Sequence, residues 1–392
     1  MFSIYSRRQE DIAKTGSHPS LICQGALNLH NFPQSASDQP ATDASQVYWG
    51  GPDLPERRLR DLLEERIHAT PSGGEILWVT YYFRDEGLAT ALLQASNRGV
   101  RVRVAMEGDP RTGDINKRVR ALLEGADGLG RGLRSLKHLI PDNRFLRLCR
   151  LHEKLYYFSH PLPYALVGTF NPSGNSSEDP AVLHKIGDQD RGHNMLVEIC
   201  ETTLIAGLYA HAEQLFAGHH GPWERFLPRL NMVLTSGNTR VLFFPRSQWS
   251  AFDALFDVLG PGSRLRMAVS HLNDRGICKR LFGLARQGVK IEIIAHDTKR
   301  RVPSWVEQQM LENGIIFNRY VHPEGLPMHN KFMLFETPGK RISAFGSMNL
   351  SVRSLRANHE LLVVSEELPL YQEIEKRWRS MLKEISEWAK ES

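Results

Sequence analysis

An internal duplication constrains this fold more than any other feature of the chain. An apolar run at 76–80, a helical pattern at 87–98 and an alternating run at 100–104 follow one another. The same order recurs 189 residues later, without a gap, at 265–269, 276–287 and 289–294. Each copy predicts a strand–helix–strand unit, which favours a parallel strand pair with a right-handed crossover.

Several residue identities agree between the two copies. The matching pairs are Asp85 and Asp274, Gly87 and Gly276, Leu92 and Leu281, and Gly99 and Gly288. The alternative is a chance resemblance between two unrelated units. We favour a duplicated α/β fold, in which two pseudo-twofold-related α/β/α lobes meet at one active site. Helical segments at 200–216 and 368–388 close the two halves.

The duplication predicts the domain boundaries. We expect an N-terminal arm at 1–47, a first lobe at 48–220, a linker at 221–240 and a second lobe at 241–392, which includes the C-terminal helix. The arm is rich in Ser, Ala, Gln, Asp and Pro and has no sustained apolar period, so we expect it to be irregular.

Composition excludes several classes of protein. The 392 residues are 41% hydrophobic and 24% charged with a net charge of +5, which excludes a collagen-like, wholly disordered or disulfide-dense chain. The mild basic excess permits an anionic partner. The four cysteines form no C-x-x-C pair, and no secretory signal or long apolar run is evident, so we expect a cytoplasmic protein that can contact a membrane surface peripherally.

Each half contains a His-x-Lys motif. His152 and Lys154 precede a run of four apolar or aromatic residues, and so do His329 and Lys331. On a strand, residues i and i+2 share a face, so each histidine should point the same way as its lysine. One such motif carries little information, but two equivalent copies in a duplicated fold indicate a shared site.

A second pair of motifs follows. Asn171, in Gly168-Thr-Phe-Asn171, lies 19 residues after His152, and Asn349, in Gly346-Ser-Met-Asn349, lies 20 after His329. Asn194 in the first half and Asn358-His-Glu360 in the second then lead into apolar strands. Neutral donors suit phosphate oxygens, so we expect Thr169, Ser347, Asn194 and Asn358 to bind substrate.

These residue types suit phosphodiester chemistry. Lysines and asparagines can stabilise the charge on the non-bridging oxygens, while one imidazole attacks phosphorus and the other protonates the leaving group. Imidazole suits both tasks because its pKa lies near neutrality. The predicted catalytic residues are His152, Lys154, Asn171, His329, Lys331, Asn349 and Glu360, with no metal or cofactor. One chain supplies both halves, so a monomer suffices.

The motifs resemble those of the phospholipase D superfamily, H-x-K-x4-D followed by G-[GS]-x-N and N-x-E, present twice. The resemblance covers about 73–365 and implies the duplicated fold and a phosphohistidine intermediate. Ser159 and Glu336 replace the family aspartate, which usually has a structural part. We expect Glu360 to orient His329, while Leu196 stands at the corresponding place in the first half. The partner of His152 is unresolved.

The first half has extra chain between its two asparagine motifs. Asn171 and Asn194 are 23 residues apart, whereas Asn349 and Asn358 are nine apart. We interpret 172–193 as a substrate-facing lid, in which Asp188 or Asp190 could partner His152; an inert surface loop is the alternative. The aromatic runs at 81–83 and 156–158 are interpreted as core.

The substrate class remains open between lipid and nucleic acid. The motifs are most similar to those of the bacterial cardiolipin synthase-like group, which favours a phospholipid phosphodiesterase or phosphatidyltransferase. A nuclease is the alternative. The one dense cationic run, at 299–301, is too short for an extended phosphate track, which argues against it. A non-catalytic binding homologue is a third possibility. The C-terminal helix has five Lys+Arg and five Glu over 370–392, so we expect it to dock on the second lobe rather than on a membrane.

Overall fold

The computed structural model describes residues 45–113, 115–136, 150–174, 180–218, 232–245 and 250–391. Nearly all of the expected arm and residues 221–231 of the expected linker lie outside them. All of the strands and helices below belong to one compact unit, Asp43–Ser392.

The first sheet has seven strands in the order β1-β7-β6-β5-β2-β3-β4. They are β1 (Gln46–Gly50), β2 (Glu75–Thr80), β3 (Arg101–Glu107), β4 (Leu133–Leu136), β5 (Lys154–Phe158), β6 (Tyr164–Gly168) and β7 (Asn194–Ile199). Strands β2, β3 and β4 are parallel to one another, and the remaining pairs are antiparallel.

The second sheet has eight strands in the order β12-β11-β10-β13-β14-β15-β9-β8. They are β8 (Leu234–Ser236), β9 (Thr239–Phe244), β10 (Arg264–Val269), β11 (Lys290–His296), β12 (Ile316–Tyr320), β13 (Lys331–Glu336), β14 (Arg341–Gly346) and β15 (Glu360–Ser365). Apart from the extra edge strand β8, this order repeats that of the first sheet. The predicted duplicated α/β fold is confirmed.

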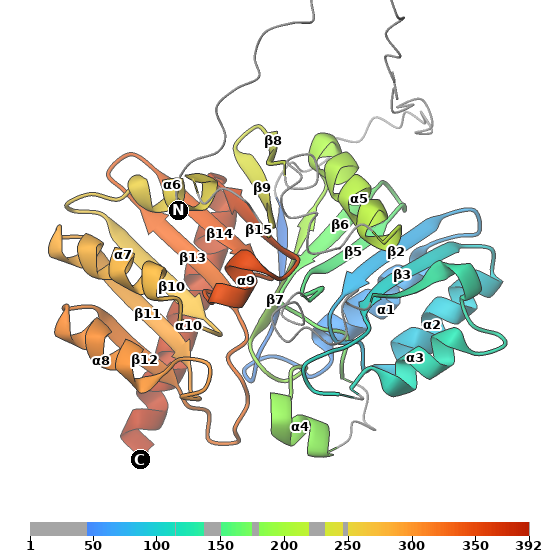
Figure 1. Ribbon diagram of the computed structural model, residues 1–392, viewed down its shortest axis with the longest axis horizontal. Coiled ribbons are helices and arrows are strands. Elements are labelled where there is room, and N and C mark those ends of the chain that lie inside the picture. The colour runs from blue at the N-terminus through green and yellow to red at the C-terminus, as the bar shows by residue number, and fades with distance from the viewer. Residues whose placement is uncertain are drawn as a thin grey trace, which may run out of the picture. The chain divides into compact units, whose positions relative to one another are not determined.

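Helices cover the sheets, as Figure 1 shows for each lobe. In the first lobe they are α1 (Arg58–Ala69), α2 (Glu86–Asn97), α3 (Lys117–Glu124), the short 3-10 helix η2 (Gly130–Gly132), α4 (Pro180–Ile186) and α5 (Thr202–Phe216). In the second they are α6 (Ser250–Asp257), α7 (Arg275–Arg286), α8 (Ser304–Glu312), α9 (Val352–Arg356) and α10 (Leu368–Glu391).

The matching aspartates of the two repeats have the same local role. Asp85 accepts a hydrogen bond from the Leu88 amide at 2.7 Å and caps α2, and Asp274 accepts one from the Ile277 amide at 2.9 Å and caps α7. The repeat therefore encodes equivalent helix starts.

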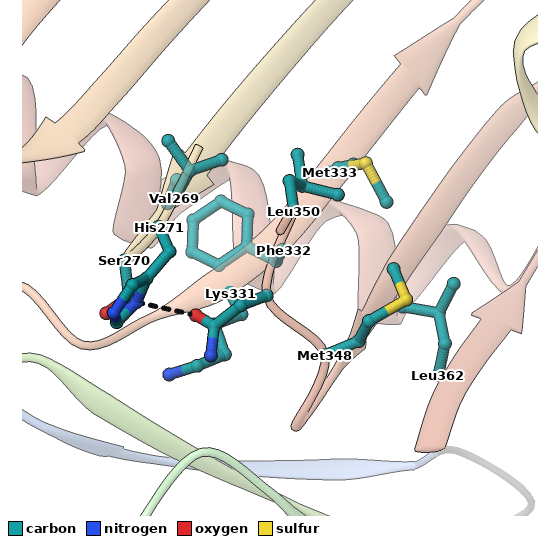
Figure 2. Close-up of a pocket in the computed structure, with 11 residues that line it drawn as sticks. Val269, Ser270, His271, Lys331, Phe332, Met333, Met348, Leu350 and Leu362 are labelled. Carbon is teal, nitrogen blue, oxygen red and sulfur yellow. Dashed lines mark hydrogen bonds between the residues drawn. The ribbon is translucent and has the colours of Figure 1, made fainter. Parts of the chain in front are cut away.

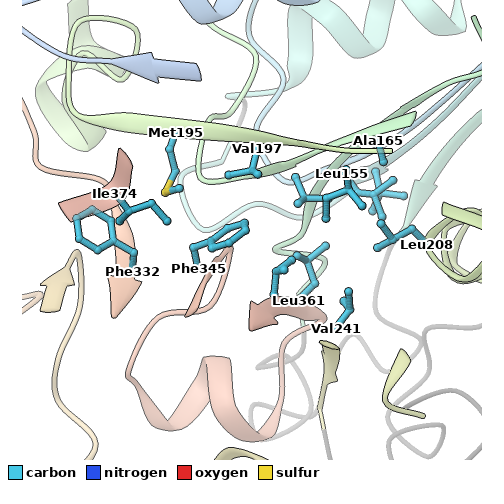
Figure 3. Close-up of a cluster of buried hydrophobic side chains, with 14 of the residues drawn as sticks. Leu155, Ala165, Met195, Val197, Leu208, Val241, Phe332, Phe345, Leu361 and Ile374 are labelled. Atoms are coloured by element: carbon cyan, nitrogen blue, oxygen red, sulfur yellow. The ribbon is translucent and has the colours of Figure 1, made fainter. Parts of the chain in front are cut away.

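Alternation along the strands divides their side chains between two cores. Leu155 and Tyr157 of β5 enter a central core that both sheets share, whereas Tyr156 and Phe158 pack on the opposite face under α1 and α2. The central core brings Met195 and Val197 together with Phe332, Phe345 and Leu361 of the second sheet, as Figure 3 shows. Because both faces of each sheet are covered, central strands such as β6 and β15 read as continuous apolar runs.

The C-terminal helix packs into this central core, as expected. Leu370, Tyr371, Ile374, Trp378 and Met381 of α10 are buried there. The helix contacts β12, β13 and β14 of the second lobe. It also contacts β1, where Arg377 donates two hydrogen bonds of 2.7 Å to Asp53 just beyond the strand. No helix among the described residues is long and apolar enough to cross a membrane.

The sheets begin earlier than the sequence suggested. β1 starts at Gln46, inside the predicted arm, and pairs with β7. β8 and the first residues of β9 lie inside the predicted linker at 221–240, where β8 forms an edge of the second sheet. Short edge strands have weak periodic signals because few of their residues are buried.

Replacing Trp378 tests whether α10 is part of the folded core. Its indole is 1% exposed, and its ring centroid lies 6.4 Å from that of Phe332 in the central core. We expect Trp378→Ala to lower the free energy of unfolding by about 3–5 kcal/mol, measured by urea denaturation. The matched control is Trp305→Ala on α8, where the ring is 36% exposed and a much smaller change is expected. Equal changes would show that α10 packs only loosely.

Candidate active site

The histidines of the two motifs lie just before strands. β5 and β13 begin at Lys154 and Lys331, so His152 and His329 precede the strands by two residues. We expected the histidine and the lysine of each motif to lie on one strand. The structure places only the lysines on strands and leaves the histidines in the preceding segments. The amide of His152 donates to the His359 carbonyl at 2.9 Å, and that of His329 donates to the His193 carbonyl at 3.0 Å. Each histidine is therefore fixed by backbone from the other lobe.

The imidazoles are also held from the opposite lobe. His152 Nδ1 lies 2.9 Å from Oε2 of Glu360, and His329 Nδ1 lies 2.8 Å from Oδ1 of Asn194. The prediction that Glu360 orients His329 is wrong, because the carboxylate faces His152 across the lobe boundary. The unresolved partner of His152 is Glu360.

Strand register explains the error. Gly168 pairs with Leu196 in the first sheet, and Gly346 pairs with Leu362 in the second. Glu360, two residues before Leu362, therefore corresponds to Asn194 and not to Leu196. The first half has an asparagine where the second half has a glutamate.

The two aspartates proposed as partners of His152 have other contacts. Asp188 accepts a hydrogen bond from the Arg191 amide at 3.2 Å, and Asp190 accepts one from the Arg57 amide at 2.9 Å. The prediction that either one partners His152 is wrong. The predicted lid does reach the site, since Lys185, Ile186 and Gln189 line its cleft.

Thr169 and Ser347 hold the orienting side chains. The Thr169 hydroxyl donates to Asn194 Oδ1 at 3.1 Å, and the Ser347 hydroxyl donates to Glu360 Oε2 at 2.6 Å. Both residues are fully buried, and their contacts give a structural role in place of the substrate contact that we expected. The preceding Gly346 has φ +151, and a Cβ atom there would collide with the Leu361 carbonyl oxygen.

The amide of Asn194 fixes the tautomer of His329. Its Nδ2 donates to the Gln189 carbonyl at 2.6 Å, so its Oδ1 faces the ring and accepts the proton of Nδ1. Ionised Glu360 is an acceptor and selects the same tautomer of His152. Both rings line the cleft and keep Nε2 for a substrate.

The lysines and asparagines surround these rings. Lys154 Nζ donates to the His152 carbonyl at 2.7 Å, and Lys331 Nζ donates to the His329 carbonyl, also at 2.7 Å. Asn349 lines the cleft, and its Oδ1 lies 3.1 Å from Nδ1 of His271. Figure 2 shows the side chains of His271 and Lys331, which line one pocket of the second lobe.

Asn171 and Asn358 are the remaining predicted residues. Asn171 is buried and donates to Gln189 Oε1 at 2.8 Å, so Gln189 presents its own amide to the cleft. Asn358 lines the cleft, and its Nδ2 lies 3.5 Å from Glu360 Oε1. The structure thus brings all of the predicted catalytic side chains to one region between the two sheets, and of these His152, His329 and Asn349 line the cleft directly. Asn171 reaches the cleft through Gln189.

The cleft above the histidines is large and cationic. It encloses about 780 Å³. Its cationic side chains besides the histidines are Arg111, Arg150, Lys185, Arg300, Arg301 and Arg353. None of the described residues that line it is an aspartate or a glutamate. This lining favours an anionic ligand.

Sequence reasoning missed several residues of the site. Tyr81 and Tyr82 were assigned to the core, yet both line the cleft, and the Tyr81 ring lies 4.9 Å from the His152 ring between centroids. His271 was overlooked, although the 189-residue offset aligns it with Tyr82. Both follow the end of a parallel strand, where ligands commonly bind in α/β folds. The core assignment of Tyr156 and Phe158 is correct.

Burial dominates the electrostatics of the site. It lowers the pKa of His152 to about 4, although Glu360 opposes the shift, and it lowers the pKa of Lys154 to about 7. Burial, Lys331, Arg301 and Lys154 together hold the pKa of His329 well below its usual range. The cations therefore stand close together with little compensating negative charge.

The positions of the family aspartate lie at the far ends of the motif strands. The Ser159 hydroxyl accepts a hydrogen bond from the Glu75 amide at 2.7 Å, and Glu336 accepts one from Arg266 at 3.2 Å. The first contact joins the start of β2 to the end of β5, and the second joins β10 to the end of β13, so both stabilise the sheets.

One group of potential metal ligands occurs among the described residues, and it forms an ion-pair network. It consists of Asp53, His193 and Glu384. Arg377 donates to Asp53 and also to His193 Nδ1, each at 2.7 Å, while His193 Nε2 lies 3.0 Å from Glu384. A metal ion there would meet the guanidinium, so we assign the group a structural role.

Comparison with known proteins agrees with the fold. The family model described as "Cardiolipin synthase, PLD-like domain" matches residues 260–382, within the second lobe. No curated protein matches the chain.

Two solved structures share the fold. Phosphatidylserine synthase from Haemophilus influenzae Rd KW20 has a TM-score of 0.60 at 11% identity, over 87% of this chain and 86% of that one. Polyphosphate kinase from Porphyromonas gingivalis has a TM-score of 0.57 at 15% identity, over 88% of this chain and 52% of that one. This chain therefore spans about half the length of the kinase.

The whole chain has a two-lobed phospholipase D-like fold. Its second lobe, over residues 260–382, matches the phospholipase D-like family model.

The lowered pKa of Lys154 predicts how anion binding depends on pH. In the free protein this lysine loses its proton near pH 7, so above that pH an anion must bind together with a proton. We expect the affinity for sulfate, which does not titrate in this range, to fall by up to about tenfold per pH unit above pH 7. Isothermal titration calorimetry from pH 6 to 8.5 measures this.

The matched control is Lys154→Arg, whose guanidinium stays charged and should flatten the profile. A dissociation constant independent of pH in the wild-type protein would contradict the prediction.

Proposed function

We propose that this protein is a phosphodiesterase or phosphatidyltransferase that acts on phospholipids through a covalent phosphohistidine. The observation that supports this most strongly is the reciprocal orientation of two histidines, each held at Nδ1 by a residue of the opposite lobe. Such an arrangement keeps two Nε2 atoms available for one phosphorus, as a two-step displacement requires.

The different partners of the two rings suggest different roles. His152 faces the carboxylate of Glu360, which stabilises the positive charge that the ring gains when Nε2 bonds to phosphorus. His329 faces the neutral amide of Asn194, so its protonated form is less stabilised and is the stronger acid. We therefore assign His152 as nucleophile and His329 as general acid.

The reaction then proceeds in two balanced steps. The Nε2 lone pair of His152 forms a bond to phosphorus, the bond to the leaving oxygen breaks, and that oxygen takes the Nε2 proton of His329. Next an alcohol or water gives its proton to His329 and attacks phosphorus, and the bond between phosphorus and nitrogen breaks. Lys154 and Lys331 stabilise the non-bridging oxygens, and no step calls for a metal or a cofactor.

The phospholipid assignment rests on the family description and on the lining of the cleft. The model that matches the second lobe describes a cardiolipin synthase-like domain. Val352, half exposed on α9, lines the cleft beside Arg353, so an apolar side chain and a cation lie together as an anionic lipid headgroup would need. We place the enzyme peripherally at a membrane surface and expect a single chain to suffice.

A nuclease is the second candidate, and the cationic lining of the cleft favours it. The sequence offers one dense cationic run at 299–301, but the cleft collects arginines from several separate segments. Nucleic-acid backbones bind such surfaces through their phosphates.

The assigned roles predict how histidine variants depend on the leaving group. p-Nitrophenolate leaves without protonation, so His329→Asn should retain much of the activity toward bis(p-nitrophenyl) phosphate and lose about 10²–10⁴-fold toward an alkyl ester. His152→Asn should lose both activities. Steady-state kinetics measures the split, and mass spectrometry of the quenched His329→Asn enzyme should detect an adduct on His152. An adduct on His329 in the His152→Asn enzyme would reverse the assignment.

A substrate panel tests the proposed class. The protein is incubated with phosphatidylglycerol, phosphatidylethanolamine, and single- and double-stranded DNA, with and without EDTA. We expect lipid products, unchanged by the chelator, because the histidines supply both the nucleophile and the acid. Products from DNA alone would select the nuclease, and activity lost in EDTA but restored by a metal ion would refute the metal-free mechanism.

A further inference from the structure

Two arginines of the cleft come from equivalent places in the two lobes. Arg111 lies four residues after the end of β3, and Arg300 lies four residues after the end of β11. Because β3 and β11 correspond in the two sheets, the pseudo-twofold relates the two arginines. Both line the cleft, together with Arg353 of α9.

These three arginines have no carboxylate partner among the residues that the structure describes. Arg150 and Arg301, by contrast, are anchored, since Arg150 donates to the Tyr81 hydroxyl at 2.8 Å and Arg301 donates to the Ser270 hydroxyl at 3.1 Å. The side chains of Arg111, Arg300 and Arg353 are exposed at the cleft, where they can turn toward a ligand.

Like charges reinforce one another across this part of the cleft. Burial and Arg111 lower the pKa of Arg300, and burial, Arg150 and Arg111 lower that of Arg353. Such repulsion is unfavourable in the free protein and is relieved when an anion binds between the guanidiniums. Guanidinium groups suit phosphate in particular, because their paired N–H donors match its oxygens.

The scissile phosphate already has its own partners. His152, His329, Lys154 and Lys331 surround that position, and Arg301 is the arginine whose charge lowers the pKa of both His329 and His271. A cleft of about 780 Å³ is much larger than one phosphodiester group needs. The exposed arginines are therefore available to a second group on the same ligand.

We propose that Arg111, Arg300 and Arg353 form a second phosphate subsite, which binds a phosphate group of the substrate or acceptor other than the one that the histidines attack. This inference rests on the proposed function for the identity of the attacked group. The ligand at this subsite is a phosphate group held at a fixed separation from the phosphodiester at the histidines. Either an anionic lipid headgroup or a free phosphate chain can supply it.

Binding to a protein that cannot turn over tests the subsite. In a His152→Asn background, isothermal titration calorimetry measures the affinity for tripolyphosphate with and without Arg111→Gln and Arg300→Gln. We expect the double arginine replacement to weaken binding by about tenfold or more, since each charged hydrogen bond contributes substantially. Arg353→Gln is the independent second variant and should weaken binding as well.

The matched control is Arg118→Gln, an exposed arginine of α3 that pairs with Glu86 and does not line the cleft. Thermal melting verifies that each variant folds. The proposal would be overturned if the cleft variants bound tripolyphosphate as tightly as the unsubstituted background does. It would also be overturned if the Arg118→Gln control lost as much affinity as the cleft variants.

A second arm identifies the source of the phosphate. Vesicles of phosphatidylglycerol in phosphatidylcholine are compared with tripolyphosphate, each with the cleft variants and the control. Loss of binding to both ligands in the cleft variants supports a headgroup at the subsite, and loss for tripolyphosphate alone supports a free phosphate chain. Because neither arm requires turnover, an inactive wild-type enzyme would defeat the proposed function and leave this result standing.

Discussion

The exchange of hydrogen bonds between lobes is the interaction on which the site depends. His152 belongs to the first lobe and is oriented by Glu360 of the second, while His329 belongs to the second and is oriented by Asn194 of the first. Neither lobe alone can hold its own histidine in this way. The large central core, to which both sheets contribute, keeps the two lobes in the register that these contacts require.

The exchange also extends to the C-terminal helix. The His193 carbonyl accepts the His329 amide, and the His193 ring is held by Arg377 and Glu384 of α10. Asn194, the next residue, is therefore positioned by a helix nearly 200 residues further along the chain. Docking of α10 contributes to the placement of His329, the proposed general acid, as well as to stability.

Sequence reasoning succeeded where the two halves keep the same spacing. The gap-free offset from Asp85 to Asp274 predicted the repeated units, and the two His-x-Lys motifs predicted the shared site. It failed where the spacing differs, because the insertion before Asn194 hides its correspondence to Glu360, which only strand register reveals. Contacts across the lobe boundary and the gathering of distant arginines are products of the tertiary fold, and no local pattern encodes them.

A nearly perfect twofold needs a break in symmetry if its two histidines are to differ. The glutamate and the asparagine at equivalent positions provide it, since Glu360 opposes the lowering of the His152 pKa, while the charges that act most on His329 are all cations and add to the lowering. In the free protein His329 therefore holds a proton poorly. A bound phosphodiester brings negative charge next to that ring and opposes the shift. In the proposed mechanism, substrate binding and protonation of the general acid therefore become one event, which confines the acid to complexes that contain a phosphodiester.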